Sequence, residues 1–139
     1  MIGSSTNRPM TVFDIAGRAM SAQLVRLNTT ASNLANAGSV SSTRAGAFQA
    51  MRPVFRTVEG GPGLATVQVD SVVRAGVEPT RRHDPNHPLA DANGDVWEAG
   101  VDTAAELIDM VETARQYQNN VQVLQTAKTL TLDTLRLGQ

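Results

Sequence analysis

The sequence has no cysteine and few aromatic residues, with one Trp, one Tyr and three Phe among 139 residues. Without cysteine, disulfides and thiolate metal sites are excluded. Aromatic side chains supply much of the buried area in compact domains, so their scarcity favours thin contacts between helices over a thick globular core. The 12 basic and 13 acidic residues give a net charge of −1. This balance gives no support to a general attraction to nucleic acid or anionic lipid.

Long apolar runs are also missing. No segment approaches the roughly 20 apolar residues that a membrane-spanning helix requires. The first ten residues, MIGSSTNRPM, lack the apolar stretch of a cleavable secretory signal, and we expect residues 1–10 to be a mobile extension. The protein is therefore expected to stay inside the cell, or to leave by a route that reads another signal.

Both ends of the chain carry apolar residues at spacings that alternate between three and four, which places each set on one face of a helix. Because neither stripe can be buried alone, the pattern predicts a coiled coil, made by folding back or by joining neighbouring chains. The first stripe consists of Phe13, Ala16, Met20, Leu24, Leu27, Ala31 and Leu34. The second consists of Leu107, Met110, Ala114, Tyr117, Val121 and Leu124.

The first helix is expected from Thr11 to about Asn36. Thr11 with Asp14 three residues later forms a variant of the capping box, in which each side chain satisfies a free backbone N–H. The helix should end after Asn36, where Asn, Gly and Ser accumulate and compete for backbone hydrogen bonds.

Several polar residues lie close to the first apolar stripe, namely Asn28, Ser32, Asn33 and Asn36. Polar groups that are buried without partners cost free energy. We therefore expect these side chains to meet backbone groups of an adjacent chain or of a returning segment. The alternative is a frayed and solvated last turn.

The second helix is expected from Thr103 to about Leu137, opened by a capping box of Thr103 and Glu106. Thirty-odd residues of helix extend about 50 Å, and this length favours a coiled coil. A seven-residue repeat through Leu107, Ala114 and Val121 favours it too. Later apolar residues spread around the helix, which is typical of a helix surrounded by several partners. These residues are Ala127, Leu130, Leu132, Leu135 and Leu137.

The middle region, residues 39–100, holds most of the glycines and prolines, so long helices are not expected there. Residues 48–58 and 64–73 are rich in Val, Phe and Thr, and a turn sequence, EGGPG, lies between them. This pattern predicts a β-hairpin, with Pro53 restricting the first strand to an edge or a bulge. A lone hairpin is marginal in water, so it should lean on helices or on neighbouring subunits.

Residues 81–94 form the only segment that resembles an active site. Its candidate metal ligands are His83, Asp84, His87 and Asp91. Pro85 and Pro88 exclude the helix that would place two His on one face, so a rigid loop with local hydrogen bonds is expected instead. Arg81 and Arg82 should be solvated or paired with carboxylates. The alternative is a small metal-dependent hydrolase that uses the loop from His83 to Asp91.

Three segments resemble known signatures. SAQLVRLNTTASNLANA at residues 21–37 resembles the amino-terminal signature of bacterial flagellar axial proteins, which include rod, hook and hook-associated proteins. ELIDMV at residues 106–111 and ARQYQNNVQVL at residues 114–124 resemble the matching carboxy-terminal signature. The loop DPNHPLAD at residues 84–91 is similar to one found in the proximal rod. The chain departs from the family pattern at residues 98–102, where EAGVD stands in place of a common Pro-Asn-Val-Asp run.

The resemblance implies a structural subunit of the flagellar basal-body rod, the drive shaft that transmits motor torque to the hook. It implies no catalysis and no cofactor. In this family the terminal helices pair as an antiparallel coiled coil around a central channel, and hairpins pack outward between subunits. Subunits are exported unfolded by the flagellar type III apparatus, without a cleavable signal, and are required for motility.

The resemblance also implies partners and a division of the chain. The expected partners are copies of the chain itself, rod proteins of the FlgB, FlgF and FlgG types, FliE and MS-ring components, and the export apparatus. Neither nucleic acid nor direct membrane insertion is implied. After the extension at residues 1–10, the core helices are expected in residues 11–38 and 101–139. The β-hairpin and an extended loop fill residues 39–100 between them.

We predict that contacts between subunits use residues of both helices. The apolar candidates are Leu24, Leu27, Leu34, Leu107, Val111, Tyr117, Val121 and Leu124. The polar candidates, which would fix the register because an unpaired buried polar group penalises wrong alignments, are Asn28, Asn33, Asn36, Arg115, Gln118 and Asn119. An ordinary intramolecular core is the alternative for the apolar set.

Overall fold

The computed structural model describes residues 10–75 and 77–139. Residues 1–9 of the expected mobile extension therefore lie outside the described residues. The elements in chain order are α1 (Val12–Asn36), β1 (Val40–Ser41), β2 (Met51–Gly61), β3 (Leu64–Arg74), β4 (Thr80–His83), β5 (Asp95–Glu98) and α2 (Thr103–Leu137). The prediction of two long terminal helices around a middle antiparallel β region is confirmed. Neither described helix has the apolar length that a membrane crossing needs.

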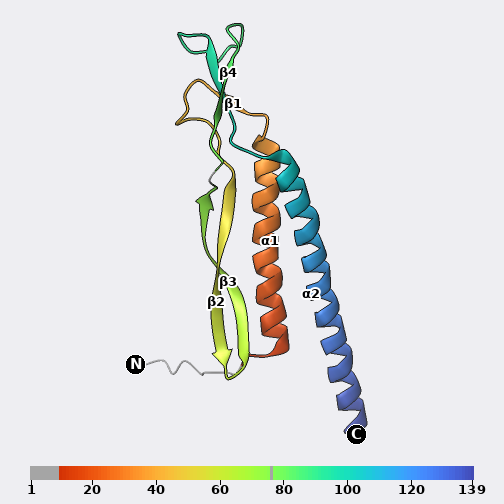
Figure 1. Cartoon of the computed structure of the whole chain (residues 1–139). Helices are drawn as coiled ribbons and strands as arrows, with labels where there is room; N and C mark the ends of the chain where they lie inside the picture. Colours follow the sequence, from red (N-terminus) through yellow and green to blue (C-terminus); the bar gives the residue numbers. More distant parts are fainter. Residues whose placement is uncertain (1–9, 76) are drawn as a thin grey trace, which may run out of the picture.

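The molecule is elongated, and its two helices lie side by side (Figure 1). Gln23 is hydrogen-bonded to Gln116 and Asn33 to Glu106, so the helices run in opposite directions. The hairpin of β2 and β3 lies along α1. A small sheet sits at the end of the molecule where α1 finishes and α2 begins.

The capping box predicted from the sequence is present at the start of α1 but not at the start of α2. At α1 the capping box is confirmed, because Asp14 N donates to Thr11 Oγ1 at 3.2 Å and Thr11 N donates to Asp14 Oδ2 at 2.9 Å. At α2 the predicted box is wrong. The N-cap is Asp102, whose side chain accepts from Ala105 N at 3.1 Å. Glu106 does not close a box because its carboxylate is turned inward to other partners.

The predicted hairpin is present. It pairs antiparallel from Met51 opposite Arg74 to Gly61 opposite Leu64. The tight turn depends on glycine at Gly63, where φ is +73°. A register shift follows Val54, just after Pro53, as expected of a strand that must accommodate a proline. Thr66 Oγ1 donates to the Ile15 carbonyl at 3.3 Å and joins the hairpin to α1.

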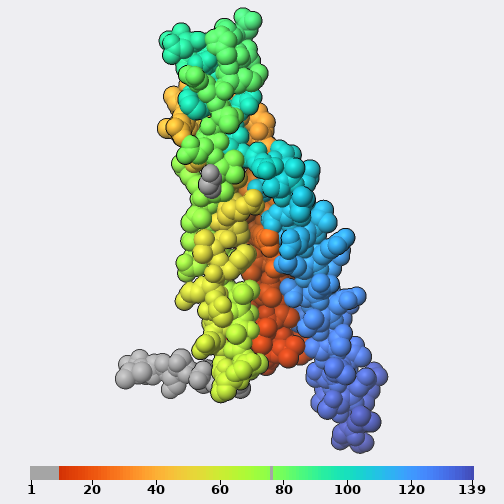
Figure 2. Space-filling model, viewed as in Figure 1, coloured from red at the N-terminus to blue at the C-terminus, as the bar shows by residue number. Residues whose placement is uncertain are grey.

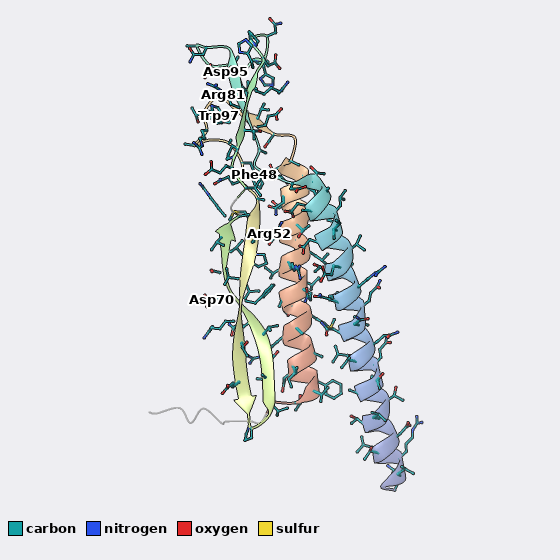
Figure 3. All side chains as sticks on the ribbon, in the orientation of Figure 1. Phe48, Arg52, Asp70, Arg81, Asp95 and Trp97 are labelled. Carbon is teal, nitrogen blue, oxygen red and sulfur yellow. The ribbon has the colours of Figure 1, made fainter. Side chains whose placement is uncertain are left out.

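A second sheet, with strands in the order β1-β5-β4, replaces part of the loop expected at residues 81–94. That expectation is wrong for residues 81–83, which pair with β5, with Arg81 opposite Trp97. Ion pairs join Arg81 to Asp95 at 3.5 Å and Arg82 to Glu98 at 2.6 Å. Arg81, Asp95 and Trp97 lie together in this sheet (Figure 3). The strands are two to four residues long and lack alternation, so the sequence pattern did not reveal them.

Gly100 connects the two sheets with α2. Its N–H donates to the Phe48 carbonyl at 2.8 Å, and its carbonyl accepts from Ala50 N at 3.1 Å. A Cβ at this position would collide with the Val77 carbonyl oxygen and lie 2.9 Å from the carbonyl carbon of Glu78. Both are backbone atoms and cannot swing aside. The close packing of the backbone at Gly100 against the backbone at Val77 and Glu78 therefore requires a residue without a side chain.

We predict that Gly100→Ala lowers the free energy of unfolding by about 1–3 kcal/mol, because the added methyl group overpacks a junction of backbone atoms. Urea unfolding followed by circular dichroism measures the change. Gly38→Ala is the matched control, since a Cβ there meets nothing within 4 Å. Equal stability of the two variants would contradict the assignment of Gly100 as a packing constraint.

Candidate assembly interface

The buried part of the molecule is small and largely polar. Among the described residues the buried hydrophobic side chains are Ala16, Ala22, Ala50 and Val96. The buried polar side chains are Thr30, Asn33, Thr66, Asp95, Glu106 and Thr113. A core of this kind is far thinner than that of an ordinary domain. Many large apolar side chains of the described residues therefore remain exposed to solvent.

The centre of the helix pair is a group of hydrogen-bonded and charged side chains that we call the polar cluster. It consists of Arg26, Thr30, Asn33, Arg52, Glu106 and Asp109. Glu106 is 1% exposed and lies 2.6 Å from Arg52 Nη2, measured to its Oε1. Its Oε2 accepts from Asn33 Nδ2 at 3.1 Å.

Asp109 is the second carboxylate of the polar cluster. It forms an ion pair with Arg26, accepts from Thr30 Oγ1 at 3.0 Å and lies 3.7 Å from Arg52 Nη1. Two carboxylates thus face two guanidinium groups. This balance matters because a buried charge without a partner strongly destabilises a fold.

The polar cluster also joins the hairpin to both helices. Asn33 Nδ2 donates to the Met51 carbonyl at 2.9 Å, and Met51 N donates to Asn33 Oδ1 at 2.8 Å. Arg52 follows on the same strand, β2, beside the helices (Figure 3). The expectation that Asn33 meets the backbone of a returning segment is confirmed. Asn36 instead donates to the Ser32 carbonyl of its own helix at 2.8 Å.

The buried repeat of α2 lies one residue before the predicted one. Glu106 and Thr113 are buried, whereas Leu107 is 52% exposed. Thr113 turns its hydroxyl to the Asp109 carbonyl at 2.7 Å, which satisfies it without a partner on α1. Near Asn33 and Glu106 the helices therefore meet through polar side chains, and Leu107, next to Glu106, faces solvent.

The residues predicted for subunit contacts fall into two groups. Half-buried in the isolated chain are Leu27, Leu34, Asn36, Tyr117, Val121 and Leu124. Exposed are Leu24, Asn28, Leu107, Val111, Arg115, Gln118 and Asn119. Asn33 alone among the candidates is fully buried, at 0% exposure. The structure brings Asn33 into the polar cluster and leaves the others half-buried or exposed along the two helices.

Large apolar side chains stand on the surface of both helices and the hairpin. On α2 they are Leu107, Ile108, Val111, Val123, Leu130, Leu132, Leu135 and Leu137. On the hairpin they are Val54, Phe55, Val72 and Val73, and on α1 they are Val12, Phe13 and Leu24. Extended exposed apolar surface marks sites of interaction with other proteins. Sequence periodicity found Leu107 and Val111 but missed Ile108 and the hairpin face.

The end of α2 has no neighbour within the chain. From Lys128 onward every residue is exposed, and Leu137 is 88% exposed. This end projects beyond the start of α1 and beyond the rest of the molecule (Figure 2). The expected spread of apolar residues around the helix is present here, and four leucines face solvent.

The loop that carries the candidate metal ligands is held by local hydrogen bonds. Asp91 Oδ1 accepts from Asp95 N at 3.0 Å and from Asn93 N at 2.8 Å, and these bonds, led by that from Asp95, hold the pKa of Asp91 below its usual range. His83 Nδ1 lies 2.8 Å from Asp95 Oδ1, and His87 Nδ1 accepts from Leu89 N at 3.0 Å. Within residues 10–75 and 77–139, no group of three potential ligands gathers that could hold a metal ion.

Comparison with known proteins links these elements to one family. Residues 13–38 match the family described as flagella basal body rod protein. Residues 92–137 match the one described as flagellar basal body rod FlgEFG protein C-terminal. The two matches contain all of α1 but its first residue and the whole of α2, and thus every member of the polar cluster except Arg52.

Curated relatives cover nearly the whole chain. The flagellar basal-body rod protein FlgC of Salmonella typhimurium is 44% identical over 132 residues, which span 94% of this chain and 98% of the relative. FlgC of Yersinia enterocolitica is 42% identical over the same shares. FlgC of Buchnera aphidicola subsp. Schizaphis graminum is 35% identical over 140 residues, again 94% of this chain and 98% of the relative.

We predict that Glu106→Ala lowers the free energy of unfolding by about 2–4 kcal/mol, because it leaves the Asn33 amide and the Arg52 guanidinium without their anionic partner. Glu112→Ala is the control on the same helix, since Glu112 is exposed and accepts only from Gln116 Nε2 at 3.2 Å. The control should change the free energy by less than about 0.5 kcal/mol. Urea titration monitored by circular dichroism separates the two, and similar small effects would show that the polar cluster contributes little.

Proposed function

The chain belongs to the flagellar basal-body rod protein family as a FlgC-like structural subunit, and we propose that its paired terminal helices are the core through which it enters the rod. Members of this family are structural proteins of the basal body and not enzymes. The small metal-dependent hydrolase considered for residues 83–91 is therefore set aside. Assembly with other basal-body proteins follows from the family.

The observation that carries this proposal is the unequal distribution of apolar residues between inside and outside. Among the described residues the buried apolar side chains are three alanines and one valine, while leucines and valines along α2 are exposed. Burying one exposed Leu or Val side chain stabilises a complex by about 1.5–3 kcal/mol. An assembly that covers several of them gains more free energy than the isolated chain obtains from its own apolar core.

We assign the assembly core to residues 11–38 and 101–139, paired as an antiparallel coiled coil, with residues 39–100 packed outward between subunits. The antiparallel contact of α1 and α2 supports the pairing. In this proposal the outer apolar contacts come from Leu24, Leu107 and Val111. The half-buried Leu27, Leu34, Tyr117, Val121 and Leu124 serve both the pair and the neighbours that close over it.

Polar residues in the proposed interface fix the alignment of neighbouring subunits. Asn28, Arg115, Gln118 and Asn119 are exposed next to the apolar residues. A shifted neighbour would bury them without hydrogen-bond partners, at a cost in free energy. Asn33 and Asn36 act indirectly. Both are hydrogen-bonded within the chain and fix the shape of the surface that a neighbouring subunit meets.

Export and location form the last part of the proposal. We propose that the flagellar type III apparatus exports the chain unfolded and that it joins the rod across the periplasm. Its neighbours would be rod proteins of the FlgB, FlgF and FlgG types, FliE and the MS ring. A thin apolar core supports this route, because unfolding such a chain for passage through a channel costs little hydrophobic free energy.

We expect the double variant Leu107→Asp, Val111→Asp to fold normally but to be absent from isolated basal bodies, and cells that depend on it should not swim. Both side chains are more than half exposed, so the charges disturb contacts between subunits and not the fold of one chain. Immunoblots of basal bodies and soft-agar motility in a strain lacking its own copy measure the two effects.

The control is Gln125→Asp, which adds a negative charge at an exposed polar position of the same helix. Circular dichroism of each purified variant verifies the fold. Normal incorporation and swimming of the double variant would contradict the assignment of Leu107 and Val111 to the interface.

A further inference from the structure

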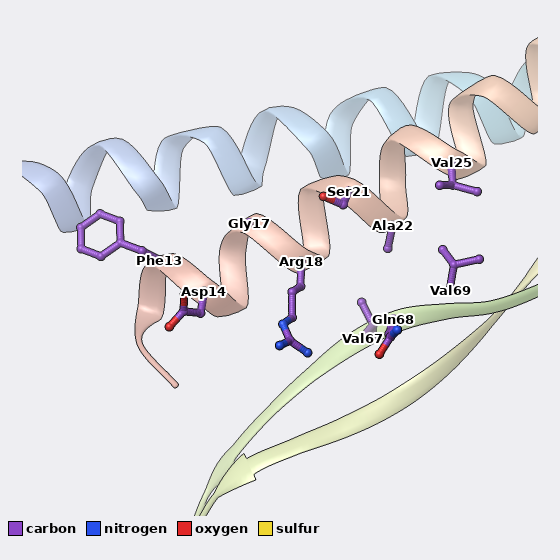
Figure 4. A pocket seen from close by; sticks show the side chains of 10 residues that line it. All are labelled: Phe13, Asp14, Gly17, Arg18, Ser21, Ala22, Val25, Val67, Gln68 and Val69. Atoms are coloured by element: carbon purple, nitrogen blue, oxygen red, sulfur yellow. The ribbon is translucent and has the colours of Figure 1, made fainter. Parts of the chain in front are cut away.

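A groove runs between α1 and β3 on one face of the molecule. Its larger part, a cavity of about 650 Å³, is lined by Gly17, Arg18, Ser21 and Val25 from α1 and by Val67 and Val69 from β3 (Figure 4). A second hollow of about 330 Å³ starts at Val25 and continues to Ser32. At 1.5 Å per residue, the two parts follow α1 from Gly17 to Ser32 for about 22 Å, a little over four helical turns.

The wall of this groove suits a close approach by another helix. Gly17 and Ser21 are one turn apart, and a Cβ at Gly17 would meet nothing within 4 Å. Valines from both sides supply the apolar surface. Arg18 is exposed and projects from α1 toward the strand (Figure 4). Asp14, one turn before Arg18, also lines the groove, but within residues 10–75 and 77–139 Arg18 forms no ion pair, so an incoming carboxylate can pair with it.

The helix α2 of the same chain does not fill the groove. Gln23, which bonds to α2, lies about 200° around α1 from both Ser21 and Val25, at 100° per residue. The two faces are therefore on opposite sides of α1. The described helix α2 therefore does not reach the groove, and a second copy of the chain can supply the helix that does.

The projecting end of α2 has the matching features. In the antiparallel register set by Gln23 and Gln116, the start of α1 lies opposite residue 127, so residues 128–137 extend about 15 Å past it. This end carries four exposed leucines. Among them stands Asp133, 57% exposed and only 3.9 Å from its helical neighbour Arg136, a weak surface contact.

We propose that residues 128–137 of one copy of the chain dock in the groove between α1 and β3 of a second copy, antiparallel to α1, with Asp133 beside Arg18. This inference rests on the proposed function and adds to it a specific contact between one subunit and the next. Antiparallel alignment then places Leu130 beside Ser21, one turn further along the groove. The contact is between unlike surfaces and leaves each end of a pair open, so it propagates instead of closing on itself.

Charge exchange tests the pairing. Arg18→Asp or Asp133→Arg alone places like charges together and should lower incorporation into basal bodies by about tenfold. The double variant Arg18→Asp, Asp133→Arg restores opposite charges and should recover incorporation. Both residues are exposed, so all three variants should unfold in urea at the wild-type midpoint. Failure of the double variant to recover, or normal incorporation of both single variants, would overturn the proposal.

Disulfide cross-linking between introduced cysteines identifies the occupant of the groove. The chain has no cysteine of its own, so no native cysteine of this chain contributes to the cross-links. A strain expressing Ser21→Cys, Leu130→Cys should give a ladder of cross-linked copies in oxidised basal bodies. The control pair Glu112→Cys, Leu130→Cys should not. Attachment of the groove cysteine to a different rod protein, or the absence of any ladder, would overturn docking between copies.

These results are separable from the rod assignment. If the wild-type chain enters basal bodies and the Leu107, Val111 variant does not, the proposed function stands whatever the charge exchange gives. If the wild-type chain is itself absent from basal bodies, the proposed function fails, and the docking between copies then fails with it.

Discussion

The burial of Glu106 is the constraint on which the rest of the structure depends. A carboxylate at 1% exposure needs partners, and they come from α1 through Asn33 and from β2 through Arg52. Three elements far apart in the sequence are thereby held at one point. Hydrogen bonds are directional and apolar contacts are not. These polar contacts therefore restrict the register of the helix pair and the orientation of the hairpin more strongly than the packing of alanines does. Asp109, Arg26 and Thr30 repeat the arrangement one turn further along.

Using polar contacts inside frees the apolar residues for use outside. An ordinary small domain buries most of its leucines in its own core, whereas in this chain five leucines of α2 are exposed, four of them at its projecting end. In the assembly that we propose, the charged groups give each subunit a defined shape, and the leucines provide the free energy of association. A structural subunit of the basal-body rod needs both a defined shape and strong contacts with its neighbours.

Sequence periodicity was sufficient for the elements that extend over many residues. The long helices, the capping box at Thr11 and the hairpin around the EGGPG turn all follow from local patterns, and each is present. Periodicity failed where the deciding partner is distant. The pattern favours Leu107 as the buried residue, but Glu106 is buried instead because it pairs with Arg52. Arg52 lies 54 residues away in the sequence, so no local rule reveals this contact. The same holds for the capping box at Thr103, which loses Glu106 to the polar cluster. The four-residue strands β4 and β5 were too short and too charged to show a pattern.

The unequal lengths of the two helices have a consequence at a larger scale. With 25 residues in α1 and 35 in α2, the molecule has a blunt end beside the small sheet and a tapered end formed by a single helix. Such an object points in one direction, much as an arrow does. A fibre made by stacking it inherits that polarity, so its two tips differ chemically, and elongation from one tip need not resemble elongation from the other.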